Sequence, residues 1–381
     1  MKRKLYKTQI EVPEGKIDFS VGQPCWSVLP VELMRQASDH CLSQGNTLML
    51  NYGPAQGDGP FLETLATFLT SAYGYRVDPL SLMVTGGASQ ALDMVCALFT
   101  EPGDTIFVEE PTYFIAPLIF KEHKLNIVAV PVEEDGMDID ALESLLTEHT
   151  PAFIYTIPAY QNPTGINLSA EKRQRLVDLS VAHNFLVVAD EVYQLLGYAD
   201  APPQPLAAMI DTETVISIGS FSKIFSPALR LGWLHAGPKL LDRLVDMKFI
   251  FSGGAVSQYS AHLACSALQL GLYEPYLDEL KHVYSRRSQA LCEALHQQLG
   301  DMATFCDPTG GFFVWVELPS HVNAKALLPL AARHDVNFHP GVTFSNQDGF
   351  SNFIRLCFTM YEPDELTEGV RRLARVLKES G

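Results

Sequence analysis

The chain has 381 residues, a formal net charge of −17 and a hydrophobic content of 47%. Because this length exceeds one ordinary hydrophobic core and no Pro/Gly/Ser-rich linker divides the chain, we expect two closely packed domains. The acidic balance disfavours nucleic acid and anionic lipid as partners. No apolar segment reaches the roughly 18 residues of a membrane span, and the first residues lack the apolar core of a secretory signal, so we expect a cytoplasmic protein.

The seven cysteines give no sign of a disulfide framework or a metal site. They are scattered, odd in number, and lack the spacing of CxxC or Cys/His metal ligands. We therefore expect most of them to be small buried hydrophobic residues, and we expect no bound metal. Cys25, beside Trp26, is the one cysteine in a segment with other features of interest.

From about residue 80 the chain alternates short apolar segments with helical patterns, which is typical of an α/β fold with a mostly parallel sheet. The first expected strand, residues 82–85, leads into Gly86 and Gly87 and then into a helix. Ser169, followed by a helical pattern as far as His183, predicts a helix N-cap. Further strands are expected at residues 105–108, 153–157, 185–189, 215–218 and 231–235.

The pattern changes after residue 272. A charged, amphipathic stretch to about residue 299 predicts a long helix that carries the chain out of the large domain. Residues 310–318 and 352–360 then predict strands of a second, smaller unit. We expect the first 45 or so residues to pack with this smaller unit.

Polar side chains follow four of the apolar strands. Ligands of open parallel sheets bind beyond the carboxyl ends of the strands, so the residues there are candidates for a binding site. They lie at 110–113, 161–165, 190–193 and 220–223. Together they bring a lysine, carboxylates, phenols and amides to one edge of the predicted sheet.

One cofactor accounts for both a lysine and a carboxylate at this edge. An amine such as that of Lys223 condenses with an aldehyde, and pyridoxal 5′-phosphate (PLP) also requires a carboxylate beside its ring nitrogen. Asp190 follows a strand too apolar to tolerate an unpaired charge at low cost. We therefore predict that Lys223 binds PLP as a Schiff base. Asp190 would keep the ring nitrogen protonated, so that the ring accepts electron density from the substrate α-carbon.

The same edge offers a site for the phosphate of the cofactor. Residues 86–89 lie between a strand and a helix, where free backbone N–H groups and the helix dipole attract an anion. Arg230, seven residues after Lys223, can add a bidentate contact. Ser220 and Ser222 offer hydroxyl donors from the same turn.

Each of these features has an ordinary structural explanation when it is taken alone. Paired glycines are common in strand-to-helix turns, and a lysine after a strand is usually solvated. An aspartate at a strand end is often a turn or cap residue, and Arg230 can pair with a surface carboxylate. Their order and spacing together favour the cofactor site. A nicotinamide-binding fold is disfavoured because the Gly86–Gly87 turn lacks GxGxxG spacing.

Eight motifs occur in order along the chain: Tyr52-Gly53, Gly86-Gly87-Ala88-Ser89-Gln90, Tyr113, Asn162-Pro163-Thr164-Gly165, Asp190-Glu191-Val192-Tyr193, Ser220-Phe221-Ser222-Lys223, Arg230-Leu231-Gly232 and Phe353-Ile354-Arg355-Leu356. The set resembles the class I and II aminotransferases of the aspartate aminotransferase fold (fold type I), from about residue 19 to the C-terminus. The resemblance implies a large PLP-binding domain, residues 46–281, with a mostly parallel seven-stranded sheet flanked by helices. A smaller α+β domain would comprise residues 1–45 and 282–381.

The resemblance also implies a role for each matching residue. Lys223 would move the proton at the substrate α-carbon, with Asp190 and Tyr193 as the other catalytic residues. Tyr193 and Asn162 would bind the 3-oxygen of the PLP ring, and Tyr113 would stack on it. The residues that would hold the phosphate are Gly87, Ala88, Ser89, Ser220, Ser222 and Arg230. Tyr52 would reach the phosphate bound by the neighbouring subunit, which implies a homodimer with shared active sites.

Three residues would bind the substrate carboxylate: Arg355, Asn162 and Gly22. The role of Arg355 can be argued independently, because its guanidinium lies among apolar neighbours in an alternating strand and needs an anion or water. Without the resemblance, a structural ion pair explains Arg355 about equally well. Gly22 belongs to a segment, residues 21–24, that resembles the lid-side contact of the family.

The spacing between Lys223 and Arg230 is one residue shorter than in the aspartate-type enzymes. It resembles the branch with aminoadipate aminotransferases, kynurenine aminotransferases and MocR-like regulators, as do Gln161 and Trp315. We do not expect a regulator, because those proteins carry an N-terminal DNA-binding domain. Only about 17 residues precede the first family-like motif here, and the chain is acidic.

We expect a transaminase that moves an amino group between an α-amino acid and a 2-oxo acid. Residues 21–30 contain no cation for a second carboxylate, and Trp26, Val28, Leu29 and Phe251 favour an aromatic or bulky aliphatic side chain. A β-lyase, or other α-carbon chemistry on the same scaffold, remains an alternative. A non-catalytic ligand-sensing module is the alternative from another class.

Overall fold

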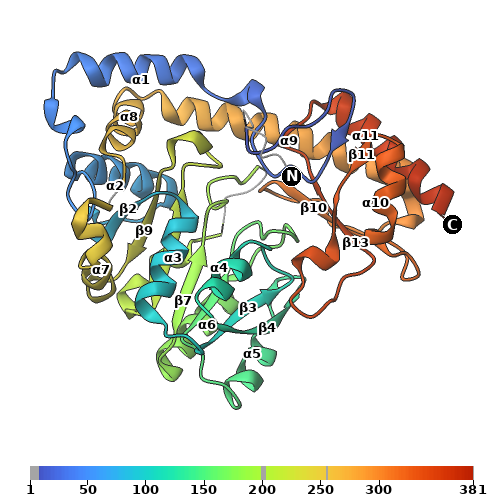
Figure 1. The fold of residues 1–381 in the computed structure, drawn as a ribbon, viewed down its shortest axis with the longest axis horizontal. Helices are drawn as coiled ribbons and strands as arrows, with labels where there is room; N and C mark the ends of the chain where they lie inside the picture. Colours follow the sequence, from blue (N-terminus) through green and yellow to red (C-terminus); the bar gives the residue numbers. More distant parts are fainter. Residues whose placement is uncertain (1–7, 199–202, 255, 381) are drawn as a thin grey trace, which may run out of the picture.

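The computed structural model describes residues 8–198, 203–254 and 256–380. Its largest element is a sheet with the strand order β2-β9-β8-β7-β6-β3-β4-β5 (Figure 1). β3, β4, β6, β7 and β8 run parallel, and β9 is antiparallel to β2 and β8. The strands are β2 (Leu82–Thr85), β3 (Thr105–Glu110), β4 (Asn126–Glu133), β5 (Gly136–Met137), β6 (Phe153–Thr156), β7 (Leu186–Asp190), β8 (Val215–Ser220) and β9 (Gly232–Ala236).

This sheet confirms the predicted α/β class and the mostly parallel arrangement. Seven strands form the body of the sheet, and the two-residue β5 pairs antiparallel with β4 as an eighth. The inner strands β6 and β8 are buried throughout, as expected where helices cover a parallel sheet on both faces. β4 lies outside the strand ranges expected from the sequence. Pro131 interrupts its pattern, and most of its side chains are exposed or half-buried.

Helices connect the strands and cover the sheet. The predicted helix after Ser169 is confirmed, since the Ser169 hydroxyl accepts a hydrogen bond from the backbone N–H of Lys172 and Asn184 ends the helix with a φ of 55°. The helices of this part are α2 (Gly59–Tyr73), α3 (Ala88–Phe99), α4 (Ala116–Glu122), α5 (Ile139–Leu146), α6 (Ala170–His183), α7 (Pro238–Val245) and α8 (Gln258–Gln269). No helix in the described ranges is long and apolar enough to cross a membrane.

A second unit follows the long helix α9 (Tyr273–Leu299), which extends from α8 toward β10 in Figure 1. It contains an antiparallel sheet in the order β10-β13-β12 and a short parallel pair of β1 with β11. Its other elements are β1 (Ile17–Asp18), β10 (Phe313–Glu317), α10 (Ala324–Arg333), β11 (Val336–Asn337), β12 (His339–Pro340), β13 (Phe353–Cys357) and α11 (Pro363–Ser380).

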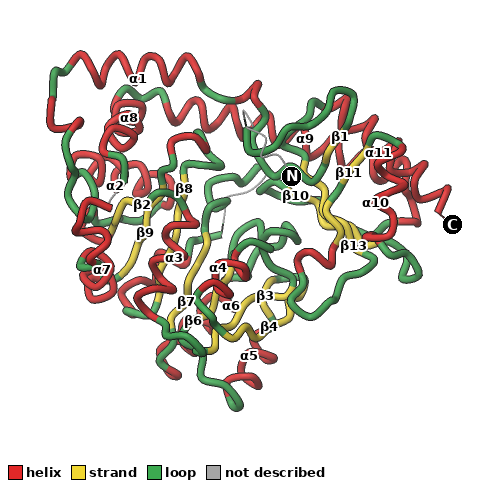
Figure 2. Tube along the Cα trace, viewed as in Figure 1, coloured by secondary structure: helices red, strands yellow, loops and turns green. Residues whose placement is uncertain are grey.

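The described part of the N-terminal segment, residues 8–45, contacts both units. β1 pairs with β11 of the second unit, whereas α1 (Val31–Ser43) packs against α8 beside the large sheet. Between β1 and α1, the chain passes the space between the two sheets, where loops predominate (Figure 2). The N-terminal segment is therefore placed to contribute to a site between the strand ends and the second unit.

Loops at the carboxyl ends of the parallel strands bond directly to the second unit. After β3, the N–H of Thr112 donates to the carbonyl of Phe344 (3.0 Å). After β7, the N–H of Tyr198 donates to the carbonyl of Thr309 (2.9 Å), and Leu196 accepts from Gly311 (3.0 Å). These bonds fix the second unit over the predicted binding edge.

Arg173 of α6 braces the loops behind this edge. Its side chain is 2% exposed and donates to the carbonyls of Leu168 (2.8 Å), Gln204 (2.7 Å) and Pro158 (2.6 Å). It also lies 3.9 Å from the buried carboxylate of Glu191, the residue after Asp190. Arg173 thus connects α6 to the segment that bears Asp190.

Replacing Arg173 with Met should lower the free energy of unfolding by about 3–5 kcal/mol, because three carbonyls and a buried carboxylate lose their cation. Arg175→Met on the same helix is the matched control. Its side chain is 37% exposed and pairs with Asp140 and Glu143 at the surface, where ion pairs contribute little to stability, so the expected loss is much smaller than for Arg173→Met. Urea unfolding followed by circular dichroism measures both, and equal losses would contradict the proposed brace.

Candidate active site

Asp190 and Lys223 come from neighbouring parallel strands. Asp190 is the last residue of β7, and Lys223 lies three residues beyond the end of β8. The carboxyl ends of these strands meet at one edge, so the structure brings together the two residues that the sequence singles out. Each shifts the pKa of the other group toward its charged form, which reflects their proximity.

The carboxylate of Asp190 is buried and only partly satisfied. Its Oδ2 accepts a hydrogen bond from the hydroxyl of Tyr155 (2.7 Å), while its Oδ1 has no partner among the described residues. Burial raises the pKa of Asp190 to about 6, against the lowering effects of the Tyr155 hydroxyl and the backbone N–H of Val192. A buried carboxylate oxygen without a donor fits a protonated pyridine nitrogen, which supplies both the hydrogen bond and the charge.

The pKa of the Lys223 amine is lowered, whereas that of Asp190 is raised. Burial lowers the pKa of Lys223 to about 8, and the nearby positive charge of Arg355 contributes to the lowering. Its Nζ donates to the carbonyl of Gly22 (2.9 Å) and lies 5.4 Å from the ring centroid of Phe312. A lysine with a lowered pKa is neutral more often near pH 7, and the neutral amine is the form that attacks an aldehyde.

Arg355 of β13 faces the same space from the second unit. Its Nη1 donates to the side-chain oxygen of Asn162 (2.9 Å) and its Nη2 to the carbonyl of Ser20 (3.0 Å). The guanidinium carbon lies 4.0 Å from the ring centroid of Phe313 and 4.8 Å from that of Phe344. Burial lowers the pKa of Arg355 to about 10.

The ion-pair explanation of Arg355 is not met by the structure. No carboxylate forms a salt bridge with Arg355 in the described part of the chain, and its Nε is buried without a hydrogen-bond partner. A buried guanidinium with free N–H groups suits an anion that arrives from outside the chain. Gly22 accepts a hydrogen bond from Lys223 and Asn162 accepts one from Arg355, so the structure places these residues in one group.

The predicted phosphate residues form a second group. Gly87 has a φ of 93° and caps α3, which begins at Ala88 and Ser89. Arg230 reaches across to donate from Nη2 to the carbonyl of Gly86 (3.2 Å). A Cβ atom at position 87 would lie 3.2 Å from the same Nη2, so glycine allows this close approach. In the neighbouring turn, the hydroxyl of Ser220 accepts from the N–H of Ser222 (3.1 Å).

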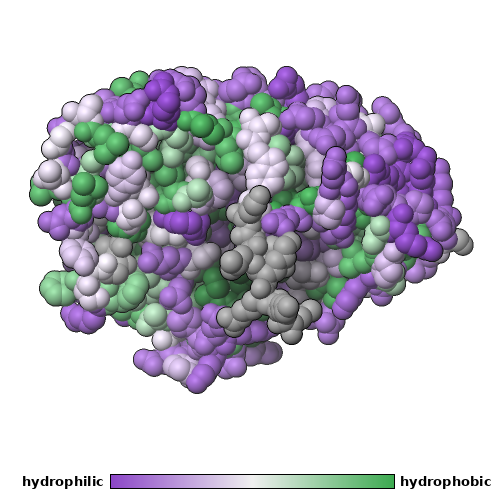
Figure 3. Space-filling view, turned by 45° about the horizontal axis from the view of Figure 1, so that its top comes forward, coloured by the Kyte–Doolittle hydropathy of each residue, from purple (hydrophilic) through white to green (hydrophobic). Residues whose placement is uncertain are grey.

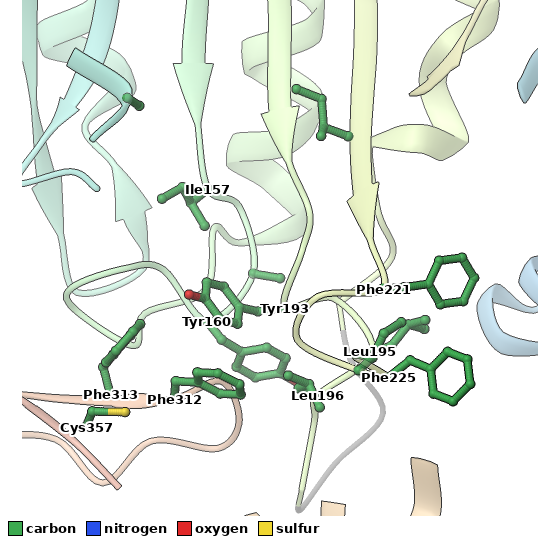
Figure 4. Close-up of a cluster of buried hydrophobic side chains, with 14 of the residues drawn as sticks. Ile157, Tyr160, Tyr193, Leu195, Leu196, Phe221, Phe225, Phe312, Phe313 and Cys357 are labelled. Carbon is green, nitrogen blue, oxygen red and sulfur yellow. The ribbon is translucent and has the colours of Figure 1, made fainter. Parts of the chain in front are cut away.

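Aromatic rings separate the strand ends from the second unit. Figure 4 shows Tyr193 close to Phe312 and Phe313, and the ring centroids are 5.4 and 6.0 Å from that of Tyr193. Tyr113 is half-buried, and burial raises its pKa to about 12, with the charge of Asp190 acting in the same direction. Tyr52 is the predicted site residue that stands apart, with 86% of its surface exposed.

Two residues that position the site were not predicted as site residues. Tyr155 lies in β6 opposite Val188, two residues before Asp190, and its hydroxyl reaches the carboxylate. Glu109 of β3 is buried and accepts from the Thr156 hydroxyl (2.5 Å) and the Gln161 amide (3.1 Å), which holds the loop that leads to Asn162. A polar residue inside an apolar strand is the sequence signal for both.

A model of the family described as aminotransferase class I and II matches residues 14–373. The chain belongs to this family. The match covers both units and all of the grouped residues around Asp190, Lys223 and Arg355. This aminotransferase therefore has the fold-type I architecture that its motifs predict.

Relatives named as aminotransferases match over nearly their full length, and HTH-type transcriptional regulators such as YdfD of Bacillus subtilis also match, at 27% identity with 97% of this chain and 76% of that relative covered. The aromatic-amino-acid aminotransferase 1 of Thermococcus litoralis is 32% identical and covers 95% of this chain and 88% of that relative. The 2-aminoadipate transaminase of Thermus thermophilus is 33% identical, with 96% and 90% covered. The structure of a Pyrococcus horikoshii kynurenine aminotransferase superposes with a TM-score of 0.90 at 30% identity, with 96% and 91% covered.

These findings confirm the branch predicted from the spacing between Lys223 and Arg230. The protein is a PLP-dependent transaminase. When bound, PLP supplies an aldehyde that condenses with amines and a ring that withdraws electron density from the α-carbon. The residues present fit this cofactor, because Asp190 Oδ1 lacks a donor and Lys223 carries an amine with a lowered pKa.

Asp190→Asn should stabilise the apoprotein at neutral pH and weaken PLP binding. Burial raises the pKa of Asp190 from about 4, its ordinary value, to about 6. The protonated form is therefore favoured by folding, and wild-type stability falls as the pH rises from about 4 through 6. Without this carboxylate, the apo variant should gain about 2–3 kcal/mol over wild type at pH 7 and nothing below pH 4.

The measurement is the unfolding free energy of both apoproteins across this pH range, together with PLP affinity at pH 7. Asp211→Asn, an exposed aspartate on the same unit, controls for the loss of one negative charge. A variant that is no more stable than wild type at pH 7 would show that burying the charged Asp190 carboxylate does not destabilise the apoprotein.

Proposed function

We propose that this aminotransferase transfers the amino group of an aromatic or bulky aliphatic amino acid to a 2-oxo acid. The observation that carries the proposal is Arg355, a buried cation that contacts Phe313 and Phe344 and has no acidic partner in the described ranges. Such a site suits an α-carboxylate beside an apolar side chain. Residues 21–30 supply no cation for a second carboxylate. The relatives named for aromatic amino acids and kynurenine support the same substrate class.

Lys223 would hold PLP and, once displaced by the substrate, transfer the proton at the α-carbon. Asp190 would hold the proton on the ring nitrogen, and Tyr193 and Asn162 would donate to the ring 3-oxygen. Tyr113 would cover one face of the ring. Arg355, with Asn162 and Gly22 beside it, would fix the substrate carboxylate, so that the α-hydrogen faces the Lys223 amine.

The phosphate would bind at the turn before α3. Its proposed contacts are Gly87, Ala88, Ser89, Ser220, Ser222 and Arg230. The free N–H groups at the start of α3 and the Arg230 guanidinium, which already lies against Gly86, support this placement.

Tyr52 would complete the phosphate site of a neighbouring subunit, so we propose a homodimer with shared active sites. Large apolar side chains are exposed near Tyr52, both in the preceding turn, residues 47–50, and in residues 249–251, close to Gly253, which contacts the Tyr52 ring. They are Leu48, Leu50, Phe249 and Phe251. Figure 3 shows hydrophobic residues interspersed with hydrophilic ones over the left half of the molecule, whereas the right half is mainly hydrophilic. An apolar surface of this kind suits a partner subunit.

We further propose that residues 46–281 act as the PLP-binding domain and that residues 1–45 and 282–381 act as the smaller domain. The junction would fall within α9, whose 27 residues span both units. A cytoplasmic location is proposed because all seven cysteines are free thiols.

Lys223→Ala should lose turnover by about 10²–10⁴-fold, because the variant lacks both the amine that binds PLP and the base that moves the α-proton. The visible absorbance of the lysine-bound cofactor should disappear with it. Lys239→Ala, an exposed lysine on α7, serves as the control and should retain activity. Full turnover by the Lys223 variant would refute the assignment.

A panel of amino donors should favour phenylalanine, tyrosine and leucine over aspartate by at least about tenfold in kcat/KM, since a second carboxylate meets no cation near the apolar side chains. Mass spectrometry should identify the new amino acid formed from the 2-oxo acid acceptor. A panel in which aspartate is the best donor would refute the substrate class. Release of ammonia and a 2-oxo acid, without a new amino acid, would indicate a lyase.

A further inference from the structure

The segment that carries Tyr52 packs against the side chain of Gln258 on one side, while the Tyr52 side chain is largely exposed to solvent. We call residues 51–57, between the helical turn Thr47–Leu50 and α2, the Tyr52 arm. The backbone N–H of Tyr52 donates to the side-chain oxygen of Asn51 (2.8 Å), and the ring lies against Gly253, where a Cβ atom would approach it to 3.0 Å. With 86% of Tyr52 exposed, the direction of its phenol depends mainly on the position of the backbone.

The side chain of Gln258 fixes that backbone position. Gln258 is the first residue of α8, and its Oε1 fills the space beside Gly53, where a Cβ atom would come within 2.1 Å of it. The φ of Gly53 is not in the left-handed region, so this contact is the reason for a glycine there. The arm therefore rests on Gln258 at the residue directly after Tyr52.

A buried acidic residue holds Gln258 in turn. Its Nε2 donates to Oδ1 of Asp58 (2.9 Å), and the ring nitrogen of His262 lies 3.3 Å from the same oxygen. Asp58 is 7% exposed, and its Oδ2 caps α2 by accepting from the N–H of Phe61 (3.0 Å). These contacts leave Gln258 little rotamer freedom, so α2 and α8 together set the place of the arm.

We infer that Gln258 is a positioning residue for PLP binding, which acts through Gly53 to aim Tyr52 at the phosphate held by the neighbouring subunit. The inference rests on the proposed function, because it takes Tyr52 as a phosphate ligand across a dimer. Gln258 lies behind Gly53 and is not among the proposed cofactor contacts. Its effect on PLP should therefore exist only while the Tyr52 hydroxyl is present.

A double-mutant cycle on PLP affinity tests this dependence. Fluorescence titration of the apoprotein gives the PLP dissociation constant of wild type, Tyr52→Phe, Gln258→Ala and the double variant. Tyr52→Phe should weaken binding about tenfold by loss of one hydrogen bond to a charged group. Gln258→Ala should weaken it about three- to tenfold, and the double variant should be no weaker than the weaker single variant.

The outcomes distinguish the proposed role of Tyr52 from the positioning role of Gln258. If Tyr52→Phe binds PLP as wild type does, the proposed cross-subunit role of Tyr52 fails and the inference fails with it. If Tyr52→Phe is weakened while Gln258→Ala is not, only the inference is overturned. Losses that multiply in the double variant overturn it too, because Gln258 would then act without Tyr52.

A steric test supplies a second, independent readout. Gly53→Ala should weaken PLP binding by displacing the arm, and Gly53→Ala with Gln258→Ala should bind better than Gly53→Ala alone, because the new methyl group gains room. Gly59→Ala is the control, since no atom lies within 4 Å of a Cβ there. Sedimentation velocity and thermal unfolding are measured alongside. A lower unfolding temperature with unchanged PLP affinity, or no rescue in the double variant, overturns the inference.

Discussion

The buried carboxylate of Asp190, with one oxygen lacking a hydrogen-bond partner in the described structure, is the constraint on which the site depends. Desolvation disfavours its charge, and the same desolvation disfavours the charge on Lys223. Burying either ionisable side chain in the core lowers the stability of the fold. Both would become favourable in the proposed complex, where Asp190 would pair with the protonated ring nitrogen of PLP and Lys223 would condense with its aldehyde. Under this proposal, the cost of burying these two groups in the apoprotein would be offset when PLP binds.

The second unit and the N-terminal segment complete what the large sheet begins. Three carbonyls within residues 20–23 accept side-chain hydrogen bonds: Ser20 from Arg355, Gly22 from Lys223 and Gln23 from the hydroxyl of Thr359. The segment therefore contacts the lysine of one unit and the arginine of the other within four residues. A displacement of this short stretch would alter the amine and the carboxylate site together. This explains why the chain returns to the centre of the molecule before α1 packs against α8.

The sequence predicts the residues whose importance follows from their position along one strand. Asp190, Lys223 and Arg230 lie at or after strand ends, where the α/β pattern alone points to a ligand. Residues whose role depends on pairing between distant elements could not be found in this way. Tyr155 reaches Asp190 only because β6 and β7 pair in one particular register, and Gln258 meets Gly53 only because α8 packs on α2. β4 escaped prediction for a local reason, since Pro131 and its half-exposed side chains weaken the strand pattern. The contact of α1 with α8 is likewise a matter of tertiary packing, which composition does not encode.

The hydrogen bonds of Arg355 have a consequence for how tightly a substrate can be held. Arginine has five N–H groups, and the bonds to Asn162 and Ser20 occupy one on each terminal nitrogen. The remaining N–H groups, including that of Nε, stay available to a carboxylate, while the two rings of Phe313 and Phe344 fix the plane of the guanidinium. The rotamer entropy of this long side chain is thus lost when the chain folds and not when the substrate arrives. A substrate carboxylate bound as proposed would meet a guanidinium that is already oriented, which would leave more of the interaction free energy for discrimination between side chains.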